Sequence, residues 1–370
     1  MTRDLRWLIS EARGQASSST LPQVSGTAGA RFAQLGPFSF TGPYGKEPAA
    51  GLGHTGRRQL SILVVTNMYP SAGHPALGTF VKEQVQSIRV QGVHVDVLFI
   101  NGPQRKLNYF TGIFRYIWWM LQRGRRYDLV HAHYVFSGLI ARLQWRLPVV
   151  LTHHGIEVVW GWQGPLSRWV SRWMDRVIVT SQAVAVSLGQ PGVTVIPCGV
   201  DLDLFRPMPQ AEARRRLGLD LEARYVVYAG RRGPEKRLDL IKDAAARLQV
   251  DDPSVRLLVL TEKPHRVVPL YFNAADVLVL ASDFEGSPMV IKEAMACNLP
   301  IVSTDVGDVA SLIGDTEGCY LCRQTAEDVA AKLSQALSFG RRTDGRNVVR
   351  HLSLEAIAGR IIEVYREVLA

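Results

Sequence analysis

The fold is decided by residues 277–303, which read VLVLASDFEGSPMVIKEAMACNLPIVS. Short apolar runs at 277–280 and 301–303 enclose a segment of helix length at 288–297. Apolar runs without clean alternation are typical of parallel strands that are covered on both faces. A strand, a helix and a second strand in this order predict a βαβ unit.

The same alternation extends in both directions along the chain. In the first half we expect strands at 62–65, 93–99, 129–132, 149–152, 177–180 and 193–196, with a helix at 80–91. In the second half we expect further strands at 225–229, 255–260 and 319–321, and helices near 236–248, 325–338 and 354–369. The predicted fold class is therefore α/β, with two doubly wound Rossmann-like domains that face each other across a ligand-binding cleft.

Composition predicts where these domains begin and end. Residues 1–58 are rich in Gly, Ser, Ala and Pro and lack an apolar period, which predicts a disordered leader or an overextended start. An N-terminal domain is expected over 59–205, a second domain over 206–352 and a C-terminal helix over 353–370. The stretch PCGVDLDLFRP at 197–207 is the expected link.

The net charge of +10 is confined to the first half. Residues 1–59 hold 7 basic and 3 acidic residues, residues 60–205 hold 13 and 7, and residues 206–370 hold 23 of each. This asymmetry indicates an anionic partner, a membrane surface or an acidic acceptor, or else a solvated basic surface. The 4 cysteines are few, and no apolar run is long enough to span a bilayer. We expect a cytoplasmic protein, soluble or peripheral at the inner face of the membrane.

The stretch from Glu285 to Glu293 carries a candidate ligand site. Ser287 is expected to cap a helix that the following proline begins, which leaves the amides of Met289 and Val290 free at its positive end. Such a helix start binds phosphate or sugar hydroxyls, and the two glutamates flank it. The alternative is a surface pair of glutamates on an ordinary capped helix.

Groups at the ends of other predicted strands agree with this site. Arg231 follows the strand 225–229 and Lys236 begins the next helix, where two cations neutralise a diphosphate leaving group. In the first half, Gly78 and Thr79 end a glycine-containing turn at 73–79, whose small residues permit close approach of a phosphate. Surface charges at a helix start and an ordinary βα turn are the alternatives.

Two adjacent histidines, His153 and His154, follow the strand 149–152, and we expect one of them to enter the cleft. Metal binding is disfavoured because adjacent side chains diverge in an extended segment and no further ligand cluster is near. Cys319 and Cys322 have finger-like spacing, but no second pair completes a site. A buried strand is the preferred interpretation of these cysteines.

Taken in order, these residues resemble the retaining glycosyltransferases of family 4, which have the GT-B architecture of two Rossmann-like domains. The resemblance covers residues 61–370. It rests on Gly78-Thr79-Phe80, the histidine pair followed by Gly155, the stretch VIPCGVD at 195–201, Arg231 with Lys236, and the glutamates of the Glu285 stretch. One departure is Gly307-Asp308, which stands where many relatives carry Gly-Gly and a later Glu.

The resemblance implies a role for each matching residue. Glu293 would hold the ribose hydroxyls of the nucleotide, and Glu285 would hold hydroxyls of the donor sugar. Arg231 and Lys236 would bind the diphosphate, and His154 would contact the sugar near the reacting carbon. The other implied donor-binding positions are Gly78, Thr79, Gly286, Ser287, Met289 and Val290.

The resemblance also implies a function. We expect a retaining hexosyltransferase of polysaccharide biosynthesis in the cell envelope, which moves a sugar from a UDP- or GDP-sugar to a glycan, lipid-linked or small-molecule acceptor. In same-face displacement the leaving phosphate accepts the proton of the acceptor, so no protein nucleophile, cofactor or divalent metal is implied. A nucleotide-sugar epimerase or phosphorylase of the same fold is an alternative. A basic nucleic-acid-binding protein is another, but no recognisable nucleic-acid module is present.

Residues 109–126 interleave aromatic and basic side chains, and Trp169 and Trp173 lie four apart near further arginines. This composition fits an interfacial helix or a lipid-linked acceptor. We favour the alternative, in which an amphipathic helix packs its aromatic side chains into the core. In both cases the acceptor is expected at the first domain.

Overall fold

The computed structural model describes residues 59–71, 77–102, 105, 107–159, 161–261 and 263–370, all within the unit Ala50–Ala370. The predicted leader at 1–58 and residues 73–76 of the predicted glycine turn lie outside the described residues. Among the described residues, no helix is long and apolar enough to cross a membrane.

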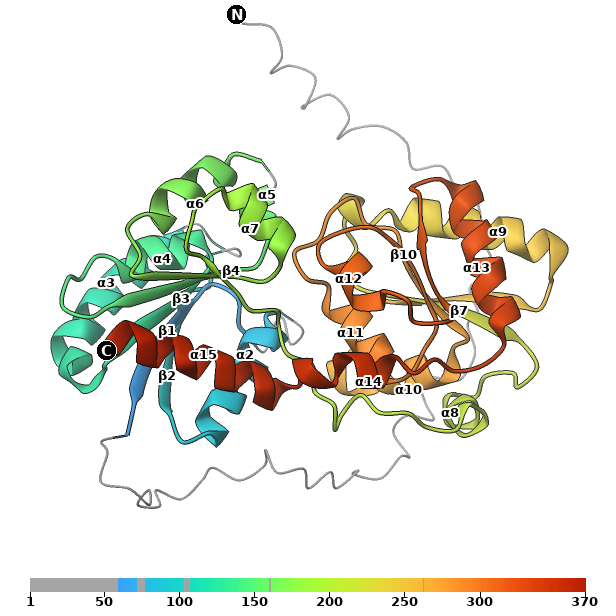
Figure 1. Ribbon diagram of the computed structural model, residues 1–370, viewed down its shortest axis with the longest axis horizontal. Coiled ribbons are helices and arrows are strands. Elements are labelled where there is room, and N and C mark those ends of the chain that lie inside the picture. Colours follow the sequence, from blue (N-terminus) through green and yellow to red (C-terminus); the bar gives the residue numbers. More distant parts are fainter. Residues whose placement is uncertain (1–58, 72–76, 103–104, 106, 160, 262) are drawn as a thin grey trace, which may run out of the picture. The chain divides into compact units, whose positions relative to one another are not determined.

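The first domain is built on a parallel sheet with the strand order β2-β1-β3-β4-β5-β6 (Figure 1). Central strands such as β1 are buried at every position, which explains their unbroken apolar sequence. The strands are β1 (Ser61–Thr66), β2 (His94–Phe99), β3 (Leu129–His133), β4 (Val149–His153), β5 (Arg176–Val179) and β6 (Thr194–Val195). The helical segments are α2 (Thr79–Val90), α3 (Leu107–Arg123), η4 (Gly124–Arg126), α4 (Val135–Ala141), α5 (Ile156–Val159), α6 (Gln163–Ser171) and α7 (Gln182–Leu188).

The second domain repeats this architecture with the strand order β11-β10-β9-β7-β8. Its strands are β7 (Arg224–Ala229), β8 (Val255–Leu260), β9 (Val277–Leu280), β10 (Ile301–Thr304) and β11 (Cys319–Cys322). Its helical segments are α8 (Gln210–Leu217), η5 (Pro234–Lys236), α9 (Leu238–Asp251), η6 (His265–Val267), α10 (Val268–Ala274), α11 (Met289–Ala296), α12 (Val309–Ile313), α13 (Ala326–Phe339), α14 (Gly345–Val349) and η7 (Arg350–Leu352). Each predicted strand is present, and the prediction of two doubly wound sheets is confirmed.

The C-terminal helix α15 (Leu354–Leu369) returns to the first domain and runs beside α2 (Figure 1). The Ser87 hydroxyl donates to the Leu354 carbonyl at 2.7 Å, and the buried Tyr365 hydroxyl lies 2.6 Å from His131 Nδ1. Where the chain crosses between the domains, the Val200 amide donates to the Leu352 carbonyl at 2.8 Å. The first domain is therefore completed by residues from the far end of the chain.

Candidate functional site

The loop between β9 and α11 lies at the carboxyl end of its parallel strand, where open α/β sheets bind ligands. The helix begins at Met289, one residue later than predicted, and Ser287 makes no capping hydrogen bond. The predicted cap is therefore wrong. Ser287 Oγ instead donates to Asp308 Oδ2 at 2.5 Å and accepts from Lys292 Nζ at 2.5 Å. The first amide of this segment that bonds within it is Ile291, which leaves the amides of Met289 and Val290 at an open helix start.

Glu285 is held in this loop by two donors. Lys236 Nζ and Ser282 Oγ lie 2.5 and 2.8 Å from its Oε1. Both bonds use the same oxygen, so in the described part of the chain Oε2 remains available to a ligand. Lys236 is largely buried beside Glu285, whereas Arg231 is 69% exposed and pairs with Glu235 at 3.1 Å. Of the two predicted diphosphate-binding cations, the structure therefore brings only Lys236 into contact with the loop.

Glu293 ends a chain of ionisable groups that reaches the first domain. His265 Nε2 lies 2.8 Å from Glu293 Oε1, and His265 Nδ1 lies 3.1 Å from Glu83 Oε1 on α2. Burial alone lowers the pKa of His265, but its hydrogen bonds to Glu293 and Glu83 outweigh burial and raise that pKa to about 10. Burial raises the pKa of Glu83, against the opposing effect of His265. His265 is thus a protonated bridge between two carboxylates at neutral pH.

Lys292 is fully buried beneath the loop. Its Nζ donates to the Cys198 carbonyl at 3.1 Å and lies 3.8 Å from Asp308 Oδ2. Burial raises the pKa of Asp308, while the Lys292 charge and the Ser287 hydroxyl lower it. Because a buried ammonium requires partners, Lys292 fixes the loop to Asp308 and to the interdomain link.

Three glycines allow close backbone contact at the site. A Cβ added at Gly286 would lie 1.8 Å from the His154 carbonyl oxygen, and one added at Gly155 would lie 2.5 Å from Gly286 Cα. A Cβ at Gly307 would lie 2.6 Å from the Gly286 carbonyl oxygen. Gly155 and Gly307 also have positive φ angles of 124° and 63°. The loops after β4, β9 and β10 therefore meet where any larger residue would collide.

His154 is packed among aromatic rings next to this contact. The ring centroids of Phe80 and Tyr134 both lie 4.8 Å from the His154 ring, and His154 Nε2 lies 3.0 Å from His133 Nδ1. Burial, followed by the charges of His133 and His153, lowers the pKa of His154 well below its ordinary value. His154 is therefore neutral at pH 7. His153 is fully buried, with Nε2 2.8 Å from Ser171 Oγ, which suits a structural role.

The turn before α2 lies beside the same histidine. Gly78 has φ 68°, and an added Cβ would lie 2.4 Å from the Met68 carbonyl carbon. A residue with a side chain is thus excluded there. Because Phe80 in the first turn of α2 packs on His154, the turn with Gly78 and Thr79 is close to the predicted site.

The family matches and the fold identify the class of protein. Residues 57–204 match the family model described as Glycosyltransferase Family 4, and residues 264–338 match the model described as Glycosyl transferases group 1. Sucrose-phosphate synthase from Thermosynechococcus elongatus has a similar fold, with a TM-score of 0.70 at 22% identity over 84% of this chain and 99% of that one. The chain is a glycosyltransferase with the GT-B fold.

Other glycosyltransferases are similar in sequence or fold. The putative teichuronic acid biosynthesis glycosyltransferase TuaC of Bacillus subtilis is 27% identical over 348 residues, which cover 75% of this chain and 89% of that protein. The D-inositol 3-phosphate glycosyltransferase of Mycobacterium tuberculosis (strain F11) is 28% identical over 313 residues, but the match covers 71% of this chain and only 64% of that protein. Anabaena Alr3699/HepE, solved in complex with UDP and glucose, has a TM-score of 0.63 at 18% identity over 84% of this chain and 100% of that one.

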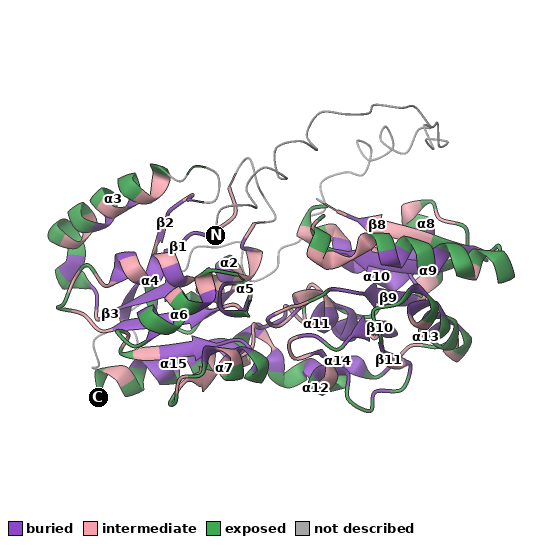
Figure 2. Cartoon of the chain, turned by 90° about the horizontal axis from the view of Figure 1, so that it is seen from above, coloured by how far each residue is buried: buried purple, intermediate pink, exposed green. Residues whose placement is uncertain are grey.

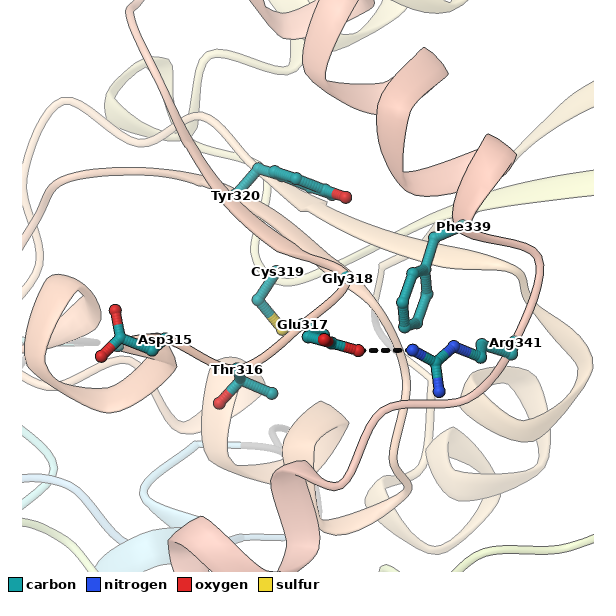
Figure 3. A pocket seen from close by; sticks show the side chains of 9 residues that line it. Asp315, Thr316, Glu317, Gly318, Cys319, Tyr320, Phe339 and Arg341 are labelled. Carbon is teal, nitrogen blue, oxygen red and sulfur yellow. Dashed lines mark hydrogen bonds and ion pairs between the residues drawn. The ribbon is translucent and has the colours of Figure 1, made fainter.

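A separate hollow in this glycosyltransferase lies at the opposite edge of the second sheet. It has a volume of about 490 Å³ and is lined by residues 314–320, Phe339 and Arg341. Figure 3 shows Glu317 and Arg341 pointing toward one another across it as an ion pair. Since residues 314–318 precede β11, this hollow borders the amino end of a parallel strand, where ligand sites are not expected. Its position therefore argues against a donor site.

Two further sequence predictions concern metals and aromatic side chains. Within the described residues no group of three or more His, Cys, Asp or Glu could hold a metal ion, and Cys319–Cys322 form β11. The prediction that the aromatic helix packs its rings into the core holds for half of the aromatic side chains of α3, since Tyr116 is buried and Tyr109 and Trp119 pack against the core. It is wrong for the other half. Phe110, Phe114 and Trp118 are 66%, 73% and 61% exposed. These exposed rings therefore favour the alternative of an interfacial helix in this glycosyltransferase.

Proposed function

We propose that this glycosyltransferase transfers a hexose from a UDP- or GDP-sugar, with retention of anomeric configuration, to a glycan, lipid-linked or small-molecule acceptor. The observation that carries the proposal is the β9–α11 loop. It places an open helix start between Glu285 and Glu293, each with only Oε1 engaged by the donors described above. Backbone amides donate hydrogen bonds to phosphate or sugar oxygens, and carboxylates accept hydrogen bonds from hydroxyl groups.

The contacts of each glutamate support a division of roles. Glu293 Oε2 accepts a hydrogen bond from a ribose hydroxyl, because the protonated His265 on Oε1 holds the side chain in a fixed orientation. Glu285 Oε2 accepts a hydroxyl of the donor sugar. The amides of Gly286, Met289 and Val290 and the Ser287 segment bind the remaining sugar oxygens.

The diphosphate is bound by cations and by the first domain. Lys236 stabilises the charge that develops on the leaving diphosphate. Arg231 is exposed in the described state and adds its charge when the donor is present. The backbone at Gly78 and Thr79 completes the diphosphate site.

In the proposed reaction the bond between the anomeric carbon and the phosphate oxygen breaks while the acceptor oxygen bonds to the same face of that carbon. The acceptor proton moves to the leaving phosphate oxygen, so no protein base, cofactor or metal is needed. His154 acts as a neutral hydrogen-bonding group near the reacting carbon, since its lowered pKa prevents it from supplying a positive charge. Its packing between Phe80 and Tyr134 fixes the orientation of its ring.

The names of the relatives point to two of the proposed acceptor classes, a glycan and a small molecule. The name of the Bacillus relative refers to teichuronic acid biosynthesis, and that of the mycobacterial relative refers to D-inositol 3-phosphate. We propose a glycan or lipid-linked acceptor that is handled by the first domain, in a protein that is cytoplasmic and peripheral at the inner face of the membrane. The excess positive charge of the first half supports this location.

The test is a thermal-shift screen of the full chain with UDP-, GDP- and ADP-sugars, followed by NMR of the transfer product. We expect one nucleotide class to raise the melting temperature, a product with the anomeric configuration of the donor, and transfer that persists in EDTA. Glu285→Gln should lose transfer, whereas Glu317→Gln in the opposite hollow is the matched control and should retain it. An inverted product would refute retention. Release of free nucleotide at full rate without any acceptor would favour an epimerase.

A further inference from the structure

Helix α3 is apolar on two sides. Its inner side contacts the first domain through Gly112 and Tyr116, which are its buried residues, and the Tyr116 hydroxyl donates to the Ala141 carbonyl at 2.8 Å. Its outer side remains exposed, and Figure 2 shows much of α3 in green, the colour of exposed residues. A surface helix of a globular protein normally turns polar residues outward. The outer side of α3 does the opposite.

The exposed apolar residues form one stripe. Leu107, Phe110, Phe114, Trp118 and Leu121 are 73%, 66%, 73%, 61% and 80% exposed. They follow each other at intervals of three or four, which places them on one face of a helix. We name these five residues the α3 stripe. A contiguous apolar surface of this kind marks an interaction site.

Along the chain, the charges that flank the α3 stripe have one sign. Residues 97–127 contain no Asp or Glu but include Arg105, Lys106, Arg115, Arg123, Arg125 and Arg126. The arginines at 115, 123, 125 and 126 are exposed. Arginines beside aromatic and aliphatic residues extend their charged groups to the phosphate level while their stems cover apolar surface. The complementary partner is both apolar and anionic.

We propose that the α3 stripe lies in the interface of a bilayer that contains anionic phospholipids. A helix of 17 residues is about 25 Å long at 1.5 Å per residue and lies flat in the headgroup region, with the stripe facing the acyl chains. A bilayer explains both the apolar stripe and the one-signed charge that surrounds it, whereas a protein partner would need a matching acidic rim. This inference deepens the lipid-linked acceptor of the proposed function and rests on it, because the same surface brings the first domain to lipid-borne acceptors.

The test measures co-sedimentation of the full chain with vesicles of 70% phosphatidylcholine and 30% phosphatidylglycerol. Wild-type protein should bind, and about 0.5 M salt or pure phosphatidylcholine vesicles should weaken binding at least about tenfold, because the charges are screened or removed. The triple variant Phe114→Ser/Trp118→Ser/Leu121→Ser should weaken binding by about a hundredfold or more. The triple variant Arg123→Glu/Arg125→Glu/Arg126→Glu should weaken it similarly on anionic vesicles only.

Matched controls lie on the second domain. Val250 is 81% exposed on α9 and Arg215 is exposed on α8, so Val250→Ser and Arg215→Glu should bind vesicles as the wild type does. Three results would overturn the proposal: no binding by the wild type, equal binding by the stripe variant, or a wild-type dimer that this variant converts to a monomer without any vesicle binding. Donor-induced thermal shifts in the same variants report the donor site separately. A failure at the membrane is therefore distinguishable from a failure of the proposed sugar transfer.

Discussion

His265 links the two domains, and its removal should change how stability depends on pH. The side chain lies between Glu83 of the first domain and Glu293 of the second, at 3.1 and 2.8 Å. We consider His265→Gln, which keeps a polar side chain but cannot carry a positive charge. The variant should lose the attraction between the imidazolium and the two carboxylates while the backbone of η6 is kept.

The magnitude follows from the raised pKa. Folding raises the pKa of His265 from the ordinary value of 6.5 to about 10. A group whose pKa is raised on folding stabilises the protein fully below its unfolded pKa, and this contribution is lost as the pH rises through the folded pKa. At about 1.4 kcal/mol per pH unit the upper limit is about 5 kcal/mol. Because the side chain is 23% exposed, solvent screening reduces this, and we expect about 2–3 kcal/mol.

The assay compares free energies of unfolding from urea titrations of wild type and His265→Gln at several pH values from 6 to 10. The wild type should be more stable by about 2–3 kcal/mol at pH 6, and the difference should shrink steadily toward zero by pH 10. His351→Gln is the control, since His351 is exposed and bonds to the Val348 carbonyl. A difference that is the same at pH 6 and pH 10 would refute a charge-based bridge and leave only a packing role for His265.

Five further substitutions test the site itself. Glu293→Ala should weaken nucleotide-sugar binding, measured by calorimetry, by about 10- to 100-fold through loss of a charged hydrogen bond. His154→Ala should lower kcat while circular dichroism shows an intact fold. Unchanged turnover in both variants would refute the site. Gly286→Ala should abolish transfer and lower the melting temperature, because its Cβ would lie 1.8 Å from the His154 carbonyl oxygen. Lys292→Met should destabilise the fold by about 3–5 kcal/mol by leaving Asp308 buried without its cation, and adding Asp308→Asn should recover part of that loss in urea titrations.

The strands were predictable because each one is a local pattern. A parallel strand that is buried on both faces, such as β9, is apolar at each position, and nothing distant is needed to recognise it. The loop with Glu285 was predictable for a similar reason, since the ends of parallel strands meet at one edge of a sheet. The helix start was displaced by one residue because Ser287 has a stronger use in the folded chain. It bonds Asp308 and Lys292 rather than the helix amides.

The residues that sequence reasoning missed act through contacts between distant segments. Glu83 and His265 lie on two different elements and meet the predicted Glu293 on a third, and no spacing along the chain relates them. Lysine side chains are usually exposed, but Lys292 is fully buried. Its place in the stretch from Glu285 to Glu293 was therefore the only sequence signal that it belongs to the site. Helix α3 was misinterpreted because apolar residues on both faces look like a core helix. Whether the second face is covered depends on the rest of the fold.

The contacts of the β9–α11 loop indicate that the proposed donor site depends on both domains. Gly286 contacts the backbone of His154 and Gly155, while Lys292 donates to the Cys198 carbonyl in the link. Neither contact survives if the domains separate, so the loop that is proposed to hold the sugar is shaped by residues of the first domain. The fully buried Lys292, which pairs with Asp308 and the Cys198 carbonyl, helps to hold the domains together. A buried ammonium without partners is costly, so the arrangement in which both partners are in place is favoured. The residues proposed to bind the donor are therefore coupled to the first domain through backbone contacts that only glycine permits.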